Sequence, residues 1–155
     1  MNVQTFLEHA KSASRIIATL DPKTKIDVLM AMADALEAHS AIIIVENQKD
    51  LEEAARNNLS SALVDRLLLN TKRIADMANA IREIAALKEP VGRILEGWVV
   101  PSGIRIEKVS IPIGVIGIIY ESRPNVTSDT AALCFKSGNA CVLKGGKEAL
   151  YSNAI

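Results

Sequence analysis

Glycine is absent from this chain before Gly92, and proline occurs only once before Pro90, at Pro22. All 8 glycines and the other 4 of the 5 prolines lie from Pro90 onward. Both residues interrupt helices and mark turns, so a long stretch without them favours consecutive helices. The sequence therefore predicts helices up to about Pro90, followed by strands joined by turns.

Capping signals place the helices of the first half. Asp21-Pro22 combines an N-cap carboxylate with proline at the first helical position, which predicts a helix start. The apolar spacing predicts a second helix over about 42–55. Ser60 or Ser61 can cap a third, short helix that runs through Leu69.

Two helices of the first half, one starting at Pro22 and a further one after Asn70-Thr71, carry an apolar stripe at helical spacing, which we expect to face the core. The first stripe is Ile26, Leu29, Ala33 and Leu36. The stronger one, after a break at Asn70-Thr71, is Ile74, Met77, Ala78, Ile81, Ile84 and Ala85. His39 falls near a helix end, where an imidazole more often caps carbonyls or stays in solvent than takes part in chemistry.

From Arg93 the period of the pattern changes to two. Segments 95–100 and 104–109 flank Pro101-Ser102-Gly103, a turn with proline at its second position and glycine at its fourth. This predicts a β-hairpin. Apolar and polar residues alternate only imperfectly along the second strand, so we expect one face of the hairpin to be exposed to solvent. We also expect that this strand could pair with another chain.

The stretch 111–120 is apolar on both alternating faces. That is typical of a central parallel strand covered by helices on both sides. It is too short, and too often interrupted by proline and glycine, to be a membrane helix.

A strand, helix, strand, helix order completes the chain. We expect a helix from about 126–129 to a left-handed cap at Gly138-Asn139, a strand over 140–143, and a helix from about Glu148. The first of these helices should turn Ala131, Ala132, Leu133 and Phe135 inward. Parallel pairing with a right-handed crossover follows, so the predicted class is α/β.

Composition narrows the classes of partner. The 18 Lys+Arg cancel the 18 Asp+Glu, which argues against nucleic acid or an anionic membrane. Two cysteines are too few for a disulfide framework, and the two histidines lie far from them in sequence, which argues against a zinc site. We accordingly expect no metal. No targeting segment is evident, so we expect a cytoplasmic location.

Ligands of parallel sheets bind beyond the carboxyl ends of the strands. Two polar segments occupy that position here, Glu121-Ser122-Arg123-Pro124-Asn125 and Lys144-Gly145-Gly146-Lys147. The common dinucleotide and P-loop glycine patterns are absent. On spacing alone, a tight turn with solvated lysines explains the second segment better than a phosphate cradle does.

The residues themselves resemble the aldehyde dehydrogenase superfamily and, within it, the gamma-glutamyl phosphate reductases. The segments that carry the resemblance are 111–117, Tyr120 to Thr127, Lys136 to Ala140, and Val142 to Gly146, with support from 95–98, Pro101-Ser102-Gly103 and Asp65-Arg66-Leu67. The resemblance covers essentially the whole chain. It implies a helical lead and the first half of a Rossmann-like cofactor-binding sheet, from the N-terminal portion of such an enzyme.

The resemblance also implies roles for individual residues. Asn125 corresponds to the asparagine whose amide helps hold the oxyanion formed when a cysteine thiolate attacks the acyl carbon; its alternative role is to cap the following helix. Lys144 corresponds to the lysine that contacts the adenosine ribose of the nicotinamide cofactor. Gly145 and Gly146 belong to the same cofactor-binding turn.

Lys147 stands where many NAD-preferring members of the superfamily have a glutamate for the ribose 2′-hydroxyl. An ammonium can pair with a 2′-phosphate that a carboxylate would repel, so we expect NADPH as the cofactor. Arg123 either meets the carboxylate or phosphate of the substrate or forms a structural ion pair with Glu121. Gly114 and Gly117 are expected to be packing glycines.

Neither Cys134 nor Cys141 is expected to be the nucleophile. Both fall in apolar surroundings, where burial raises the pKa of a thiol and suppresses its reactivity. In the family the nucleophilic cysteine lies in a later segment, which nothing in this chain matches.

The predicted organisation is a helical segment over 1–90, a hairpin over 91–110, and the first part of an NADP-binding domain over 111–155. The resemblance implies NADPH-dependent reduction of L-glutamyl 5-phosphate to L-glutamate 5-semialdehyde in proline biosynthesis, a homo-oligomer at full length, and a functional link to glutamate 5-kinase. This portion alone is expected to be inactive. The alternatives are another member of the superfamily and a non-catalytic helical assembly module.

Overall fold

The computed structural model describes residues 2–121 and 123–155. Within them the elements follow the predicted change from helices to strands. The order is α1 (Val3–Ile17), α2 (Pro22–Ala38), α3 (Ser40–Arg56), α4 (Ser61–Leu67), α5 (Thr71–Ala86), β1 (Ile94–Val99), β2 (Arg105–Val109), β3 (Val115–Ile119), α6 (Pro124–Lys136), β4 (Ala140–Lys144), the 3-10 helix η1 (Lys147–Ala149) and α7 (Leu150–Ala154).

Side-chain caps fix several helix ends. The Asp21 carboxylate accepts hydrogen bonds from the Thr24 backbone N–H at 3.0 Å and from the Thr24 hydroxyl at 2.6 Å, as the Asp21-Pro22 signal predicts. His39 ends α2, with its Nδ1 2.8 Å from the Ala35 carbonyl oxygen, which confirms its capping role. Asn70 caps α5 by accepting from the Arg73 N–H.

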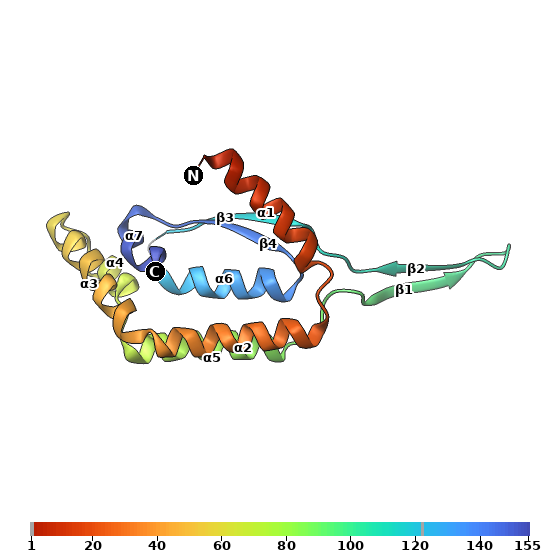
Figure 1. The fold of residues 1–155 in the computed structure, drawn as a ribbon, viewed down its shortest axis with the longest axis horizontal. Helices are drawn as coiled ribbons and strands as arrows, with labels where there is room; N and C mark the ends of the chain where they lie inside the picture. The colour runs from red at the N-terminus through yellow and green to blue at the C-terminus, as the bar shows by residue number, and fades with distance from the viewer. Residues whose placement is uncertain (1, 122) are drawn as a thin grey trace.

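The core is formed by α2, α5 and α6. All six apolar residues of the predicted α5 stripe are buried. On α2, Leu29 and Ala33 are buried and Leu36 packs against them, but Ile26 is 38% exposed, so its assignment to the core was wrong. Figure 1 shows α2 and α5 together on one side of α6, with the sheet of β3 (Val115–Ile119) and β4 (Ala140–Lys144) on the other.

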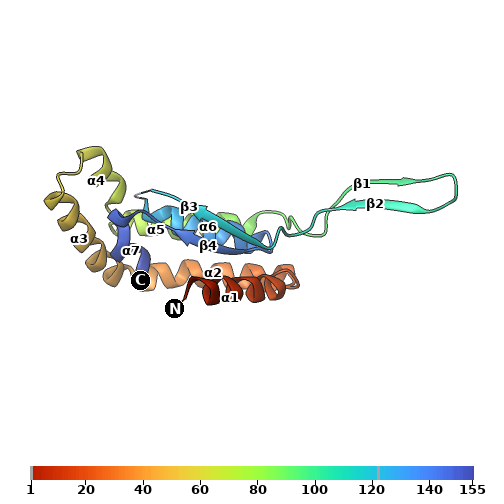
Figure 2. The ribbon, with the colours of Figure 1, turned by 90° about the horizontal axis from the view of Figure 1, so that it is seen from above.

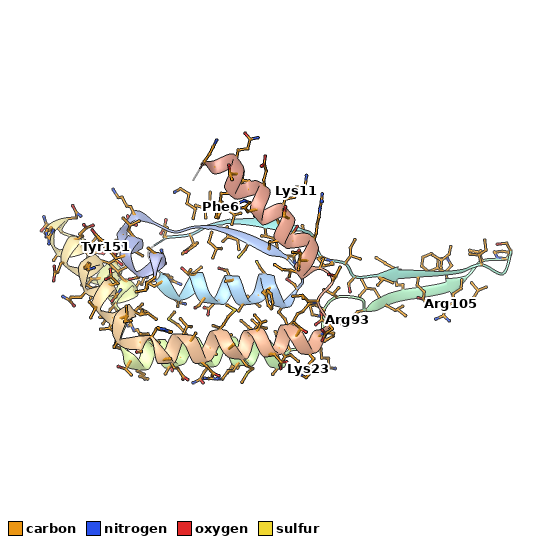
Figure 3. The ribbon with its side chains drawn as sticks, in the orientation of Figure 1. Phe6, Lys11, Lys23, Arg93, Arg105 and Tyr151 are labelled. Atoms are coloured by element: carbon orange, nitrogen blue, oxygen red, sulfur yellow. The ribbon has the colours of Figure 1, made fainter. Side chains whose placement is uncertain are left out.

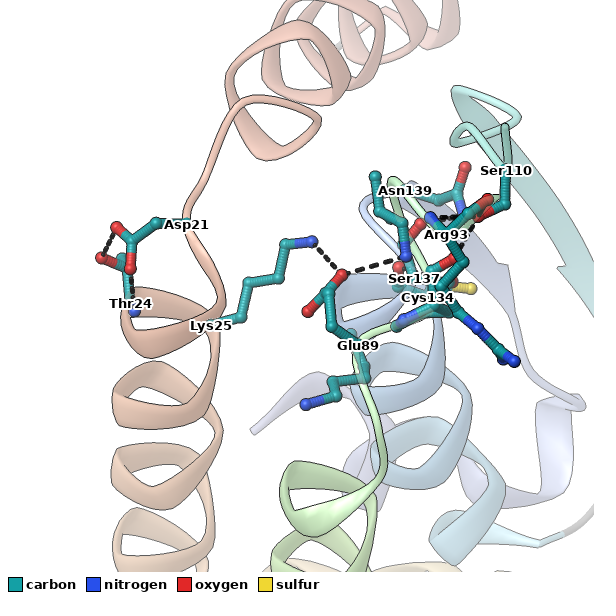
Figure 4. Close-up of polar contacts among 12 residues, drawn as sticks. Asp21, Thr24, Lys25, Glu89, Arg93, Ser110, Cys134, Ser137 and Asn139 are labelled. Atoms are coloured by element: carbon teal, nitrogen blue, oxygen red, sulfur yellow. Dashed lines mark hydrogen bonds and ion pairs between the residues drawn. The ribbon is translucent and has the colours of Figure 1, made fainter. Parts of the chain in front are cut away.

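Lys25 occupies the buried position next to Ile26, with only 1% of its surface exposed. Its Nζ lies 2.8 Å from Glu89 Oε1, and the same oxygen accepts from the Val91 N–H at 3.2 Å (Figure 4). A buried lysine without its partner would cost several kcal/mol, on the order of 3–5. The pair therefore fastens the start of α2 to the segment that leads into the hairpin.

The hairpin has the predicted turn. Gly103 donates its N–H to the Val100 carbonyl at 2.8 Å and has a positive φ of 85°, which favours glycine. Strands β1 and β2 pair antiparallel and project away from the other elements, as Figures 1 and 2 show. Every strand residue is exposed, so both faces are open rather than one. Arg105 illustrates this in Figure 3, where it lies far from the helices.

Strands β3 and β4 pair in parallel, as predicted, and lie between α1 and α6 (Figure 1). Strand β3 is shorter and less buried than the apolar run suggests. Pairing begins only at Val115, and the exposed residues include Ile113 (83%) and Ile119 (81%). Among the described residues this sheet has no third strand, so β3 pairs with β4 on one side only and is an edge strand.

Helix α6 ends at the predicted left-handed glycine. Gly138 has a φ of 77°, and the N–H groups of Gly138 and Asn139 donate to the carbonyls of Phe135 and Cys134. Ala132 is fully buried, whereas Leu133 is 48% exposed, which corrects its predicted inward orientation. Among the described residues, no single helix has the length and apolarity to cross a membrane; α2 and α3 reach that standard only as a pair, bent by 67°.

Candidate functional site

The two polar segments singled out in the sequence lie at the same edge of the sheet. Because β3 and β4 are parallel, the residues after Ile119 and those after Lys144 emerge at their common carboxyl end. The Tyr120 N–H donates to the Lys144 carbonyl oxygen at 3.1 Å, which extends the pairing to that edge. Ser122, part of the first segment, lies outside the described residues.

A cleft of about 400 Å³ opens beside the first segment. It lies between the α4–α5 region and the beginning of α6, and both Arg123 and Asn125 line it. The other lining residues are Asp65, Arg66, Leu68, Leu69, Arg73, Asp76, Met77, Ala80 and Asp129. Lys144, Gly145, Gly146 and Lys147 do not line this cleft, so the predicted site residues fall into two groups.

Asn125 is exposed in the first turn of α6. Its Nδ2 donates to Asp129 Oδ2 at 3.2 Å, one helical turn further on. An amide nitrogen carries two hydrogens, so one remains available to a ligand in the cleft. Burial raises the pKa of Asp129, and the hydrogen bond from Asn125 opposes that rise.

Three arginines line the cleft, and one of them is already engaged. Arg73 pairs with the Asp65 carboxylate at 2.7 Å and donates to the Leu68 carbonyl at 2.8 Å. The side chains of Arg66 and Arg123 have no hydrogen bond or ion pair with any described residue. Arg123 thus makes no ion pair with Glu121 among these residues, which disfavours the structural alternative considered for it.

The second segment is packed closely at its first glycine. A Cβ added to Gly145 would lie 2.3 Å from Asn153 Nδ2 and 3.2 Å from the Tyr120 hydroxyl. Thr127 holds both neighbours, since its Oγ1 lies 2.6 Å from the Tyr120 hydroxyl and 2.7 Å from Asn153 Oδ1. A side chain at 145 would therefore have to displace the Asn153 amide from Thr127, and glycine lets the turn lie against α6 and α7 without that change.

The two lysines of this segment are exposed at the edge of the sheet. Lys144 ends β4, Lys147 begins η1, and neither side chain has a partner among the described residues. The N–H groups of Tyr151 and Ser152 in α7 are already bound by the Asp50 carboxylate, at 3.0 and 2.8 Å. An anionic ligand at this segment would accordingly meet lysine side chains rather than those backbone groups.

Asp50 and Asn47 are structural residues that the pattern did not reveal. Both are buried in α3, and Asn47 donates to the Leu67 carbonyl while accepting from the Leu69 N–H. Together they tie α3 to the α4–α5 connection and to α7. The only signal in the sequence is a polar residue within an otherwise amphipathic helix, which is equally typical of a solvated face.

Both cysteines lie away from Asn125. Cys134 is nine residues further along α6, about 13 Å at the rise of an α-helix, and Cys141 lies near the opposite end of β4. Burial raises the pKa of both thiols. The structure therefore places neither thiol beside Asn125.

No family model matches the chain, but several proteins match it over nearly the whole of its own length. It is 65% identical over 147 residues to a gamma-glutamyl phosphate reductase of Nautilia profundicola and 66% identical over 151 residues to that of Aliarcobacter butzleri. These alignments cover 95% and 97% of this chain. Over nearly its whole length, the chain is therefore similar to one portion of the gamma-glutamyl phosphate reductases.

Solved structures agree with this similarity. The gamma-glutamyl phosphate reductase of Thermotoga maritima matches 95% of the chain at 41% identity with a TM-score of 0.92, and that of Saccharomyces cerevisiae matches 98% at 34% identity with a TM-score of 0.91. A probable aldehyde dehydrogenase from Listeria monocytogenes, 14% identical with a TM-score of 0.67, shares the fold. The predicted α/β fold of the aldehyde dehydrogenase type is thereby confirmed.

The match covers only part of each gamma-glutamyl phosphate reductase. The chain spans 36% of the length of the Nautilia protein and 37% of the Aliarcobacter protein. It spans 36% of the Thermotoga chain. The cleft and the lysine segment both lie within the matched portion, near the carboxyl edge of the sheet.

Proposed function

We propose that this chain contributes the oxyanion-binding amide and part of the cofactor site to an NADPH-dependent reductase. The reaction is conversion of L-glutamyl 5-phosphate to L-glutamate 5-semialdehyde and phosphate, a step of proline biosynthesis. The observation that carries the proposal is the identity of 65% over 147 residues to a gamma-glutamyl phosphate reductase. The position of Asn125 and Arg123 in one cleft supports it.

The proposed chemistry assigns one task to each polar group of the cleft. A cysteine from outside this chain attacks the acyl carbon, phosphate leaves, and a thioacyl enzyme forms. The free N–H of Asn125 donates to the oxygen that becomes negative in the attack, and an amide does so without titrating. The Arg123 guanidinium offsets the charge of the phosphate or carboxylate beside it.

The lysine segment suits a phosphorylated nicotinamide cofactor. When bound, NADPH would supply the hydride for reduction of the thioacyl group. Lys144 and Lys147 would hold its adenosine ribose and 2′-phosphate, while Gly145 and Gly146 let the backbone approach. The exposed ammonium groups at the sheet edge, which have no partner within residues 2–121 and 123–155, support this assignment.

The remaining parts of the proposal concern the whole protein. We infer a cytoplasmic homo-oligomer, with a functional link to the glutamate 5-kinase that makes an acyl phosphate of this kind. The organisation into 1–90, 91–110 and 111–155 belongs to the same proposal. The isolated portion lacks a nucleophile in place and should be inactive.

Replacing Lys147 with glutamate in the full-length protein tests the cofactor assignment. The variant should lose NADPH affinity by about 10- to 100-fold, because a carboxylate replaces a charge-assisted hydrogen bond with repulsion. NADH affinity should hold or rise. Fluorescence titration with each cofactor measures both constants.

Lys11→Glu is the matched control, because this substitution makes the same charge change at an exposed residue of α1 (Figure 3). It should leave both cofactor affinities unchanged. Unaltered NADPH binding by Lys147→Glu would exclude the 2′-phosphate role of Lys147.

A further inference from the structure

We propose that Arg66 binds the α-carboxylate of the amino-acid substrate, on the wall of the cleft formed by α4 and α5. The proposal rests on the proposed reductase function and names how that site recognises its substrate. Arg66 comes from a segment 57 residues before Arg123, yet both line the same cleft. Arg66 is the middle residue of the motif Asp65-Arg66-Leu67, to which the proposed chemistry assigns no other role.

The backbone at Arg66 is held from both sides. Leu67 is fully buried and packs in one of the core clusters. Asp65 pairs with Arg73 of α5 at 2.7 Å, and the Asp65 carbonyl also accepts from Arg73. The Arg66 side chain is exposed between these two anchors, so its origin is fixed while its guanidinium is free to bind a ligand.

The free charges of the cleft are divided between its two walls. Arg66 and Asp76 lie on the α4–α5 wall, and neither has a partner among the described residues. Arg123 and Asn125 lie on the α6 wall. One wall thus offers an unpartnered cation and an unpartnered anion. The other offers a cation beside an amide donor, and the carboxylate on that wall, Asp129, is engaged by its hydrogen bond from Asn125.

These two walls match the two ends of an acyl phosphate of glutamate. The α-carboxylate and α-ammonium form a zwitterion, which suits Arg66 with Asp76. The acyl phosphate has only negative charge and a carbonyl to be polarised, which suits Arg123 with Asn125. Placing the acyl carbon at Asn125 therefore directs the zwitterion toward Arg66.

The reverse reaction separates the two anions into different substrates. L-glutamate 5-semialdehyde carries the α-carboxylate, whereas inorganic phosphate enters independently, with NADP⁺ as the oxidant. In the full-length protein, Arg66→Ala should raise the KM for the semialdehyde about 10- to 100-fold, the size expected for losing hydrogen bonds between charged groups. The KM for phosphate should not change, and Arg66→Lys should recover part of the loss.

The controls distinguish this proposal from the reductase function itself. Arg15→Ala removes an exposed arginine of α1 outside the cleft and should leave both KM values unchanged. Asn125→Ala should lower kcat by about 10²- to 10³-fold. Wild-type kcat in that variant would count against the proposed function, whereas an unchanged semialdehyde KM, or a raised phosphate KM, in Arg66→Ala would overturn the role of Arg66 alone.

Discussion

Cys134 and Cys141 show how surroundings decide the chemistry of a residue. Burial is the first cause that raises the pKa of each thiol, and the Cys141 group beside it raises that of Cys134 further. A raised pKa lowers the fraction of thiolate at pH 7, and the thiolate is the form that attacks an acyl carbon. The position of both residues thus agrees with a nucleophile from outside this chain.

We predict that alanine at both cysteines leaves thioacyl formation intact in the full-length protein. Each thiol should react slowly with iodoacetamide at pH 7 and faster as pH rises through its elevated pKa. Mass spectrometry after brief alkylation measures the rate at each site. Loss of the acyl-enzyme in either Cys134→Ala or Cys141→Ala would show that the nucleophile had been assigned to the wrong segment.

Residue patterns predicted most of the apolar core, with Ile26 and Leu133 as exceptions, and missed the polar residues buried in it. The six positions of the α5 stripe are all buried, because a helix with one apolar face has a single way to remove that face from water. Lys25, Asn47 and Asp50 are each 1% exposed. Their burial depends on partners 64, 20 and more than 100 residues away, and no local pattern contains that information.

At the scale of elements, turn chemistry was the most reliable signal. The Pro101-Ser102-Gly103 turn and the Gly138 cap both formed as predicted, since each needs a backbone conformation that few residues adopt. Burial of β3 was not predictable in the same way. An apolar run indicates what a strand requires of its neighbours, and the described residues supply only one neighbouring strand.

The Gly138 cap gives an element-scale prediction. Gly138→Ala should destabilise the chain by about 1–2 kcal/mol, because alanine is strained at a φ of 77° and its Cβ would lie 2.8 Å from Pro112 Cγ. Gly117→Ala is the control, since its Cβ would meet nothing within 4 Å and its φ is not positive. Urea unfolding of both variants measures the difference, and equal midpoints would contradict this account of the cap.

For the whole molecule, the distribution of exposed apolar residues is uneven. The hairpin exposes apolar side chains on both strands, including Trp98 (47%) opposite Ile106 (38%). Its base is fixed by Ser110, whose hydroxyl donates to the Pro90 carbonyl and accepts from the Arg93 N–H (Figure 4). An apolar arm held at its base but uncovered along its length is typical of a surface that another protein covers.

We predict that a second copy of the full-length protein covers this arm. Trp98→Glu should convert the oligomer to smaller species in sedimentation velocity, because a carboxylate would be buried without a partner at the contact. Val45→Glu makes the same kind of change at an exposed apolar residue of α3 and should leave the sedimentation coefficient unchanged. An oligomer of Trp98→Glu that stays intact at micromolar concentration would place the subunit contact elsewhere on the molecule.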